Sequence, residues 1–298
     1  MTRRGFLVLT LGSTAWSATE QPQGVVRLGM IADPQYADKD TLRSRHYRQS
    51  LDKLRASIAQ LNEAAPDAVV TLGDFIDEDF ASFTPVLDIY RGLQPPHFAV
   101  AGNHDYEVAD ADKAKVAGLL GIRRPGTSKI FGSWRVILLD GTEVSLFRPE
   151  HADKAQEMLD RLHREGLPQA QPWNGAIGEN QMAWLEKELE EATAARQRVI
   201  LCCHYPVFPA DPHNLWNDRE VLALIDRFPC VAAWFNGHNH AGNYAMRGTC
   251  HFVNLKGMVE TADQAPYAIV SLHADHIEID GLSSEPDRHC EMPAEKSR

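Results

Sequence analysis

The sequence predicts an α/β layered domain, and two observations support this fold class. Short apolar segments bounded by turn residues recur along the chain, which is typical of buried strands. Segments with helical periodicity lie between several of them, and such alternation favours an α/β layered fold. The chain has 298 residues, of which 44% are hydrophobic. A chain of this length and composition can bury one large core.

The expected elements follow one another without a linker or an internal repeat. Strands are predicted at residues 25–32, 68–72, 97–101, 134–139, 198–203 and 230–235. Helical patterns cover residues 43–63, 109–120, 149–165 and 180–194. Three further segments, 249–256, 267–273 and 276–280, are expected to form antiparallel strands, the last two joined at Ala274-Asp275. We therefore expect one domain over residues 25–282, followed by a disordered polar tail at 283–298.

Charge and cysteine content narrow the classes of partner. The formal net charge is −11, which argues against a nucleic-acid polymer because such binding depends on clustered lysine and arginine. A small phosphate ester can still bind if cations supply the local positive charge. The five cysteines are too scattered for a disulfide framework, although a Cys230–Cys250 bridge stays open. Oligomeric state is left open as well.

Residues 1–17 are expected to form an export signal. Arg3 and Arg4, followed by a short apolar run, resemble the twin-arginine signal of bacteria, and the small residues around Ala15 offer a cleavage site. The apolar run is far below the ~20 residues that a spanning helix needs, so no stable membrane anchor is expected. The prediction is export to the periplasm, and the alternative is a cytoplasmic protein with a frayed N-terminal helix.

Polar side chains of metal-binding types follow five of the expected strands. They are Asp33 with Gln35, Asp74 with Asp77, Asn103 with His104, His204, and His238 with His240. In open α/β sheets, ligands bind beyond the carboxyl ends of strands, so the five clusters can converge on one cleft. Each cluster alone is compatible with an ordinary turn, but the whole set predicts a metal site.

The order Asp-x-Gln, Gly-Asp-x-x-Asp, Gly-Asn-His-Asp, His-Tyr-Pro and Gly-His-x-His resembles the signature of calcineurin-like metallophosphoesterases. Gln35 stands where that superfamily usually has histidine, and this glutamine is shared with manganese-dependent ADP-ribose/CDP-alcohol diphosphatases. The likeness covers about residues 25 to 282 and includes the segments 31–38, 43–48, 177–185 and 257–261. It implies a four-layer α/β/β/α sandwich of two mixed sheets, the fold of metallo-dependent phosphatases.

The resemblance also implies two divalent ions that share the carboxylate of Asp74. One ion would be held by Asp33, Gln35, Asp74 and His240, and the other by Asp74, Asn103, His204 and His238. Two ions ~3.5–4 Å apart can clamp the attacking and leaving oxygens of a phosphoryl displacement. The amide oxygens of Gln35 and Asn103 would add no negative charge. A ligand set rich in oxygen atoms favours binding of Mn²⁺. Zn²⁺, Fe and Mg²⁺ are the alternatives.

The resemblance implies that two further residues act beside the metals. By this likeness, His104 would face the phosphate and stabilise the transition state or protonate the leaving oxygen. Asp77 resembles the carboxylate that orients and charges this histidine, with a plain turn role equally open. Weaker candidates are Tyr36, Arg43 and His46 for the substrate pocket, Asp105 as a cap, and His273 and His276 as ordinary surface residues.

The resemblance implies a hydrolase that cleaves the pyrophosphate of ADP-ribose or a CDP-alcohol, by in-line attack of a metal-bridging hydroxide. The products would be a nucleoside monophosphate and a phosphorylated sugar or alcohol, so the expected partner is a small nucleotide-type phosphate. Alternatives on the same centre are a cyclic-nucleotide phosphodiesterase and a broad phosphomonoesterase. An inactive metal- or nucleotide-binding protein is the alternative of another class, and the presence of His104 beside a complete ligand set argues against it.

Overall fold

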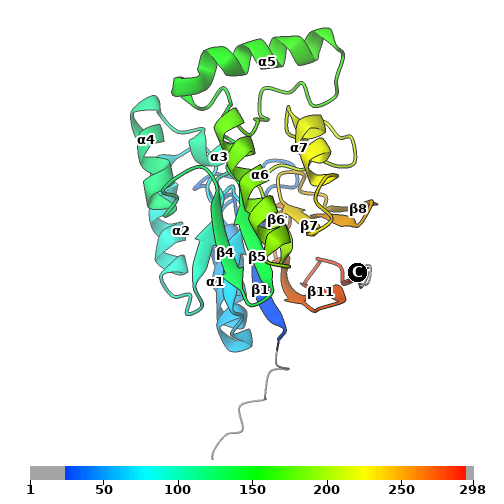
Figure 1. Cartoon of the computed structure of the whole chain (residues 1–298). Helices are drawn as coiled ribbons and strands as arrows, with labels where there is room; N and C mark the ends of the chain where they lie inside the picture. The colour runs from blue at the N-terminus through cyan, green and yellow to red at the C-terminus, as the bar shows by residue number, and fades with distance from the viewer. Residues whose placement is uncertain (1–23, 293–298) are drawn as a thin grey trace, which may run out of the picture.

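The computed structural model describes residues 24–292 and contains two six-stranded sheets (Figure 1). The strand order is β12-β11-β10-β1-β2-β3 in the first sheet and β4-β5-β6-β7-β9-β8 in the second. Parallel strands β1, β2 and β3 lie beside antiparallel β10, β11 and β12. In the second sheet β5, β6, β7 and β9 run parallel, with β4 and β8 antiparallel at the edges. Both sheets are therefore mixed.

Strands and helices alternate over most of the chain. The strands are β1 Val26–Ile31, β2 Ala68–Thr71, β3 His97–Ala99, β4 Thr127–Phe131, β5 Trp134–Leu138, β6 Arg198–Cys202, β7 Val231–Asn236, β8 Asn243–Arg247, β9 Cys250–Asn254, β10 Tyr267–Leu272, β11 His276–Leu282 and β12 Arg288–Glu291. The α-helices are α1 Ser50–Ala64, α2 Phe83–Tyr90, α3 Asn103–Tyr106, α4 Asp110–Leu119, α5 Ala152–Arg164, α6 Glu179–Ala194 and α7 Asp218–Ile225. Short 3-10 turns are η1 Phe80–Ser82, η2 Pro149–His151 and η3 Met258–Glu260.

The hydrophobic core lies between the two sheets, with helices on both outer faces. Side chains of both inner faces share one cluster, among them Leu28, Met30, Val70, Val136, Ile200 and Phe235. Helices α1 and α2 pack on the outer face of the first sheet, and α6 and α7 cover the second. In Figure 1, α5 lies at the end of the molecule opposite to the start of β1. This arrangement confirms the predicted four-layer sandwich.

Two parts of the helix prediction differ from the structure. The first helix begins at Ser50, seven residues later than the expected start at Arg43. Residues before it form turns instead, closed by two backbone hydrogen bonds between Leu42 and Arg45 of 3.1 and 3.0 Å. Tyr47 is the only residue of 43–49 that is buried, and it packs with Ala37 and Val259 in a small cluster of its own. Helices α2 and α7 were not predicted because each has only eight residues.

The expectation of a disordered tail from residue 283 is wrong for residues 283–292. Strand β12 pairs antiparallel with β11, and Cys290 and Met292 are buried in the core between the sheets. In the sequence, Cys290 and Met292 are the only apolar residues of this segment that alternate with polar ones. Such a short alternation does not predict a strand. The predicted export signal and residues 293–298 lie outside the described residues. Within 24–292, no helix is both long and apolar enough to cross a membrane.

The cysteines are all free in the described structure. Cys202 and Cys203 follow one another in and after β6 and point to opposite faces of the second sheet, one into each core layer. This is the arrangement expected for neighbours on a strand. Cys230 and Cys250 do not form a bridge, which settles the one pairing that the sequence left open.

Shortening the buried side chains of Cys290 in β12 and of Met292, which follows this strand, should destabilise the whole domain. We expect the combination of Cys290→Ala and Met292→Ala to lower the free energy of unfolding by about 3 kcal/mol, because both side chains leave cavities in the core. Urea denaturation followed by tryptophan fluorescence measures the change. The control is Glu291→Ala, whose side chain is 82% exposed and which should change stability by less than about 0.5 kcal/mol. Equal effects would show that β12 is not part of the cooperative core.

Candidate metal centre

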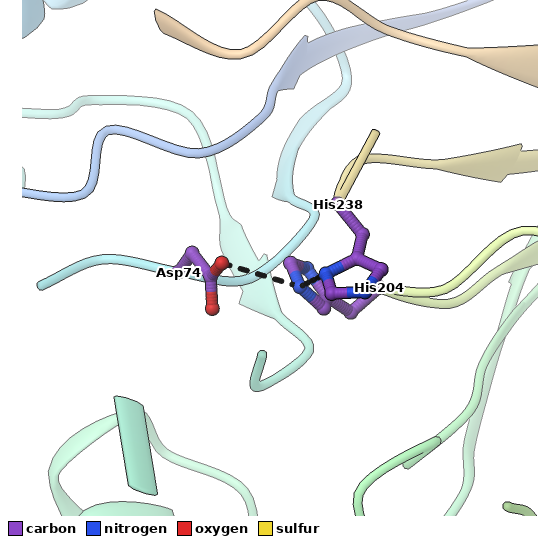
Figure 2. Close-up of side chains that lie close together, drawn as sticks. All are labelled: Asp74, His204 and His238. Carbon is purple, nitrogen blue, oxygen red and sulfur yellow. Dashed lines mark hydrogen bonds and ion pairs between the residues drawn. The ribbon is translucent and has the colours of Figure 1, made fainter. Parts of the chain in front are cut away.

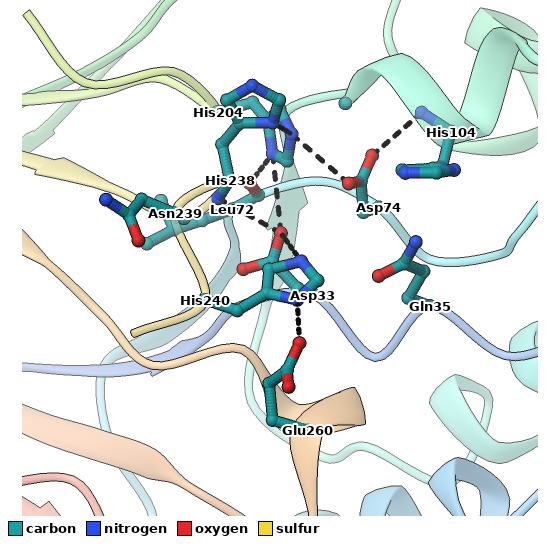
Figure 3. Close-up of polar contacts among 12 residues, drawn as sticks. Asp33, Gln35, Leu72, Asp74, His104, His204, His238, Asn239, His240 and Glu260 are labelled. Carbon is teal, nitrogen blue, oxygen red and sulfur yellow. Dashed lines mark hydrogen bonds and ion pairs between the residues drawn. The ribbon is translucent and has the colours of Figure 1, made fainter. Parts of the chain in front are cut away.

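The predicted ligands come together at the carboxyl ends of parallel strands of both sheets (Figure 3). The structure brings into one cluster the side chains that follow β1, β2, β3, β6 and β7, namely Asp33 with Gln35, Asp74, Asn103, His204, and His238 with His240. These strands run parallel within each sheet, and contacts such as that between His204 and Asp74 join the carboxyl ends of the two sheets at one edge of the sandwich. The convergence predicted from the five polar clusters is therefore present.

Four of these residues have a left-handed backbone. The φ angles are 49° at Asp33, 42° at Gln35, 51° at Asp74 and 67° at His238. For a residue with a side chain, this conformation costs about 1 kcal/mol or more. This conformation turns the backbone sharply after each strand, so that the side chains point into the cleft. The surrounding fold holds this strain at the predicted ligands.

Two glycines let the buried carboxylates approach the backbone. A Cβ atom at Gly102 would lie 2.0 Å from Oδ1 of Asp74, and one at Gly237 would lie 2.5 Å from Oδ2 of Asp33. The backbone N–H of His104 donates to Asp74 Oδ1 at 3.0 Å. The N–H of His238 donates to Asp33 Oδ1 at 3.1 Å. In both carboxylates one oxygen is fixed by the backbone and the other stays available.

The cluster contains two possible cation positions that share Asp74. Ligand atoms of Asp74, His204 and His238 lie within 4.8 Å of one another, and so do those of Asp33, Asp74 and His240. Figure 2 shows the first group, in which His204 Nε2 is 3.3 Å from Asp74 Oδ2. The Oδ1 atom of Asn103 lies 3.2 Å from the same ring nitrogen. The carboxylates and histidines of the two groups are those that the resemblance implied for each ion, with Asp74 in both.

Three buried oxygens show that this donor set suits cations. Asp33 Oδ2, Gln35 Oε1 and Asp74 Oδ2 are buried and accept no hydrogen bond in the described structure. Gln35 is oriented by its Nε2 atom, which donates to Oδ1 of Asp77 at 2.8 Å, so that its oxygen is the free end. Leaving buried acceptors unpaired is costly unless a cation binds them. The residues therefore fit two divalent ions.

Two of the histidines have one ring nitrogen bound to the protein and the other directed at the cluster. The Nδ1 atom of His204 lies 2.7 Å from the carbonyl oxygen of Leu72, and Nε2 of His238 lies 2.9 Å from Oδ1 of Asn174. The other ring nitrogens, Nε2 of His204 and Nδ1 of His238, lie 3.1 Å from each other. Burial, and then the nearby histidines, hold the pKa of His238 well below its usual value. Despite its burial, the charges of Asp74 and Asp33 instead raise the pKa of His204 to about 9, so a cation binding at His204 would have to displace a proton.

His240 is oriented by a carboxylate that sequence reasoning gave no role. Its Nδ1 atom lies 2.6 Å from Oε1 of Glu260 in η3, and this hydrogen bond lowers the pKa of Glu260 to about 2. Lys53 of α1 holds the same turn by donating to the carbonyl oxygens of Met258 and, at 2.6 Å, Thr261. Burial lowers the pKa of Lys53 to about 8. Helix α1 therefore supports a predicted ligand through η3.

His104 contacts two carboxylates beside the cluster. Its Nδ1 atom lies 2.8 Å from Oδ1 of Asp77 and 2.9 Å from Oε2 of Glu107. Burial would lower the pKa of His104, but the charge of Asp74 and these two contacts raise it well above its usual value. Lys39 forms an ion pair with Asp77. The structure thus places Asp77 against His104 as expected, and adds Glu107 and Lys39.

Asp105 has the supporting position that the sequence predicted. Its Oδ1 atom accepts a hydrogen bond from the backbone N–H of Phe75 at 2.8 Å, and Oδ2 accepts one from Gly102 at 2.9 Å. These two bonds tie the turn after β2 to the turn after β3. Burial, and then the charge of Asp74, raise the pKa of Asp105 to about 7. Asp105 therefore holds the backbone beneath Asp74 and does not face the cleft.

A cavity of about 330 Å³ adjoins the cluster, and its walls differ from the predicted pocket. Besides predicted ligands and His104, it is lined by Arg45, Glu107, Trp173 and His213. Tyr36, Arg43 and His46 are not among the lining residues, which corrects the expectation for the substrate pocket. A role on the surface of a helix was the alternative for these residues, and no helix forms there. The observed turn gives Arg43 a left-handed φ of 57° and brings Arg45 to the cavity.

Comparisons with known proteins agree with this architecture. The family model for calcineurin-like phosphoesterases matches residues 26–242. The chain is 28% identical to the manganese-dependent ADP-ribose/CDP-alcohol diphosphatase of Homo sapiens, with 94% of this chain and 96% of that protein covered. It is also 28% identical to the protein of the same name from Arabidopsis thaliana, with 76% and 83% covered.

Solved structures show the same fold. A dimetal phosphatase from Danio rerio superposes with a TM-score of 0.80 at 23% identity, over 90% of this chain and 99% of that one. A purple acid phosphatase from yellow lupin gives a TM-score of 0.56 at 12% identity, over 87% and 52%. The fold and the donor set define a metal-dependent phosphoesterase. The chain belongs to the calcineurin-like phosphoesterase family, and the enzyme is a hydrolase with a dinuclear metal centre.

Removing the charge of Glu260 should weaken cation binding. We expect Glu260→Gln to reduce the affinity for one of two ions by about 10- to 100-fold, because His240 loses the partner that fixes its ring and raises its basicity. Isothermal titration with Mn²⁺ as the probe measures both affinities. Asp263→Asn, the same change at an exposed position on the same loop, is the control. Equal affinities in both variants would show that the His240–Glu260 contact does not support the centre.

Proposed function

We propose that this enzyme hydrolyses the pyrophosphate linkage of ADP-ribose or CDP-alcohols, giving a nucleoside monophosphate and a phosphorylated sugar or alcohol, with Mn²⁺ as its metal. The observation that carries the proposal is the position of Gln35 Oε1, unpaired and buried among the predicted ligands. This glutamine is the feature by which the sequence resembles the diphosphatases. Similarity to relatives of that name over 94% of the chain supports the same assignment.

The proposal assigns the metal ligands as two sets around a shared carboxylate. One cation would be held by Asp33, Gln35, Asp74 and His240, and the other by Asp74, Asn103, His204 and His238. Bound there, the two cations would supply Lewis acidity for phosphoryl transfer. The carboxylate and amide oxygens of the set favour Mn²⁺ over softer ions.

The other residues of the cavity act on the substrate. His104 uses Nδ1 for Asp77 and Glu107, which leaves Nε2 as the nitrogen available to the leaving oxygen. The two carboxylates at Nδ1 favour the protonated ring, so His104 can donate a proton as the bond to phosphorus breaks. The guanidinium of Arg45 supplies positive charge for a second phosphate, and Trp173 offers an aromatic surface that is 38% exposed. ADP-ribose and CDP-alcohols have a second phosphate that can bind Arg45 and a base that can stack on Trp173.

A substrate panel tests the proposal. With Mn²⁺-loaded protein, kcat/KM for ADP-ribose and CDP-choline should exceed that for cyclic AMP and p-nitrophenyl phosphate by tenfold or more, about 1.4 kcal/mol in transition-state binding. A leading cyclic or monophosphate ester would assign the same centre to a phosphodiesterase or a phosphomonoesterase instead. No turnover with any divalent metal would favour a binding protein.

Asp77 is proposed as a positioning residue for His104. We expect Asp77→Asn to lower kcat for ADP-ribose by about 100-fold with KM little changed, because His104 loses its anionic partner. The loss should be much smaller with bis-p-nitrophenyl phosphate, whose leaving group needs no protonation. Glu78→Gln removes a neighbouring carboxylate that is 63% exposed and should leave kcat nearly unchanged. Equal losses with both substrates would contradict the role in proton donation.

A further inference from the structure

A second group of histidines lies in the turn after β10 and on strands β11 and β12 of the first sheet. The rings of His273 and His276 stack with centroids 4.1 Å apart and planes 9° apart. The ring of His289 lies next, 4.6 Å from His276 at 31°. The sequence gave His273 and His276 only ordinary surface roles. The structure instead joins them with a third histidine from a strand that was not predicted.

Strand register explains why these side chains meet on one outer face. In the β11–β12 pair, His276 lies opposite Glu291, and Glu278 lies opposite His289. Ile277, which lies between His276 and Glu278 in β11, points into the core. The alternating residues therefore project outward together. His273 joins them from the turn after β10, where its backbone N–H donates to the carbonyl oxygen of His276 at 3.0 Å.

This group is far from the dinuclear centre along the sheet. Leu272, which precedes His273, pairs with Val26 at the start of β1. The dinuclear centre instead follows the other end of β1, after Ile31. In Figure 1, β11 lies low in the molecule, away from α5. The two groups of histidines thus lie at opposite ends of the same strand.

The side chains are both preorganised and accessible. Ligand atoms of His273, His276 and Glu278 lie within 4.8 Å of one another, with His273 Nε2 3.9 Å from Oε2 of Glu278. The Nδ1 atom of His276 lies 2.7 Å from Oδ1 of Asp275, which fixes the ring. The side chains of His273 and His276 are 26% and 23% exposed, so an ion can reach them from solvent.

We propose that His273, His276 and Glu278, with His289 beside them, form a separate site for a divalent transition-metal ion such as Zn²⁺. His273, His276 and Glu278 supply three donors, and His289 lies beside them with its Nε2 atom 3.1 Å from Oε1 of Glu291. On binding an ion, the His289 ring would exchange this contact for the fourth position that Zn²⁺ takes in proteins. Imidazole nitrogen suits Zn²⁺, Cu²⁺ and Ni²⁺, whereas Mn²⁺ and Mg²⁺ prefer oxygen. A bound ion would join the turn after β10 to β11 and to the edge strand β12. The site therefore stabilises the C-terminal strands and does not take part in hydrolysis.

Zinc stoichiometry tests the proposal, with the dinuclear centre common to every protein compared. Titrated with Zn²⁺ after saturation with Mn²⁺, the wild-type protein should bind one equivalent more than His276→Ala. His163→Ala, which removes an exposed histidine of α5, should behave as wild type. Glu278→Gln should weaken the additional site by about tenfold or more. Equal stoichiometry in wild type and His276→Ala would overturn the proposal and leave the three rings as a stacked surface group.

Two further measurements separate loss of the site from loss of the fold. Hydrolysis in Mn²⁺ should be unchanged in His276→Ala, since this residue lies outside the dinuclear centre. Zinc at about 100 times its Kd should raise the Tm of the wild type by about 5 °C more than that of His276→Ala. An equal rise in both would again overturn the proposal. If His276→Ala fails to fold, His276→Gln with the same titration gives the answer.

Discussion

The buried carboxylate of Asp74 is the constraint on which the rest of the site depends. Its side chain is excluded from solvent, and one of its oxygens accepts no hydrogen bond in the described structure. Asp33 lies in the same environment, so two carboxylates are buried side by side. Such an arrangement is unfavourable unless cations lie between them and the histidines. The left-handed turns and the close glycines of this edge hold the carboxylates where two cations can share one of them.

The supports behind the ligands explain how a strained site can be rigid. Each predicted histidine ligand is fixed at the nitrogen that faces away from the cluster, by Leu72, Asn174 or Glu260. The partner of His240 is itself held through η3 by Lys53 of α1. Elements from both sheets and from the outer helical layer thus act on the same few atoms. Orientation of the rings is therefore a property of the packed sandwich and not of the loops alone.

The sequence predicted the elements whose signal is local. Apolar strands that end in Asp, Asn, Gln or His identified the cluster, and resemblance supplied the four layers. Residues whose position depends on distant segments were missed: Glu260 meets His240 only because β9 lies beside β7. Arg45, and not Arg43, reaches the cavity because a turn replaces the expected helix start. Strand β12 escaped prediction because only Cys290 and Met292 reveal its buried face.

The glutamine that departs from the usual histidine links the metal centre to the proposed acid. Gln35 directs its oxygen into the ligand cluster while its Nε2 atom donates to Oδ1 of Asp77. The same Oδ1 atom lies 2.8 Å from Nδ1 of His104. An amide can present an acceptor to a cation and a donor to a carboxylate at once. Asp77 consequently fixes both the amide of Gln35 and the ring of His104, so a single carboxylate oxygen connects a predicted metal ligand to the proposed acid.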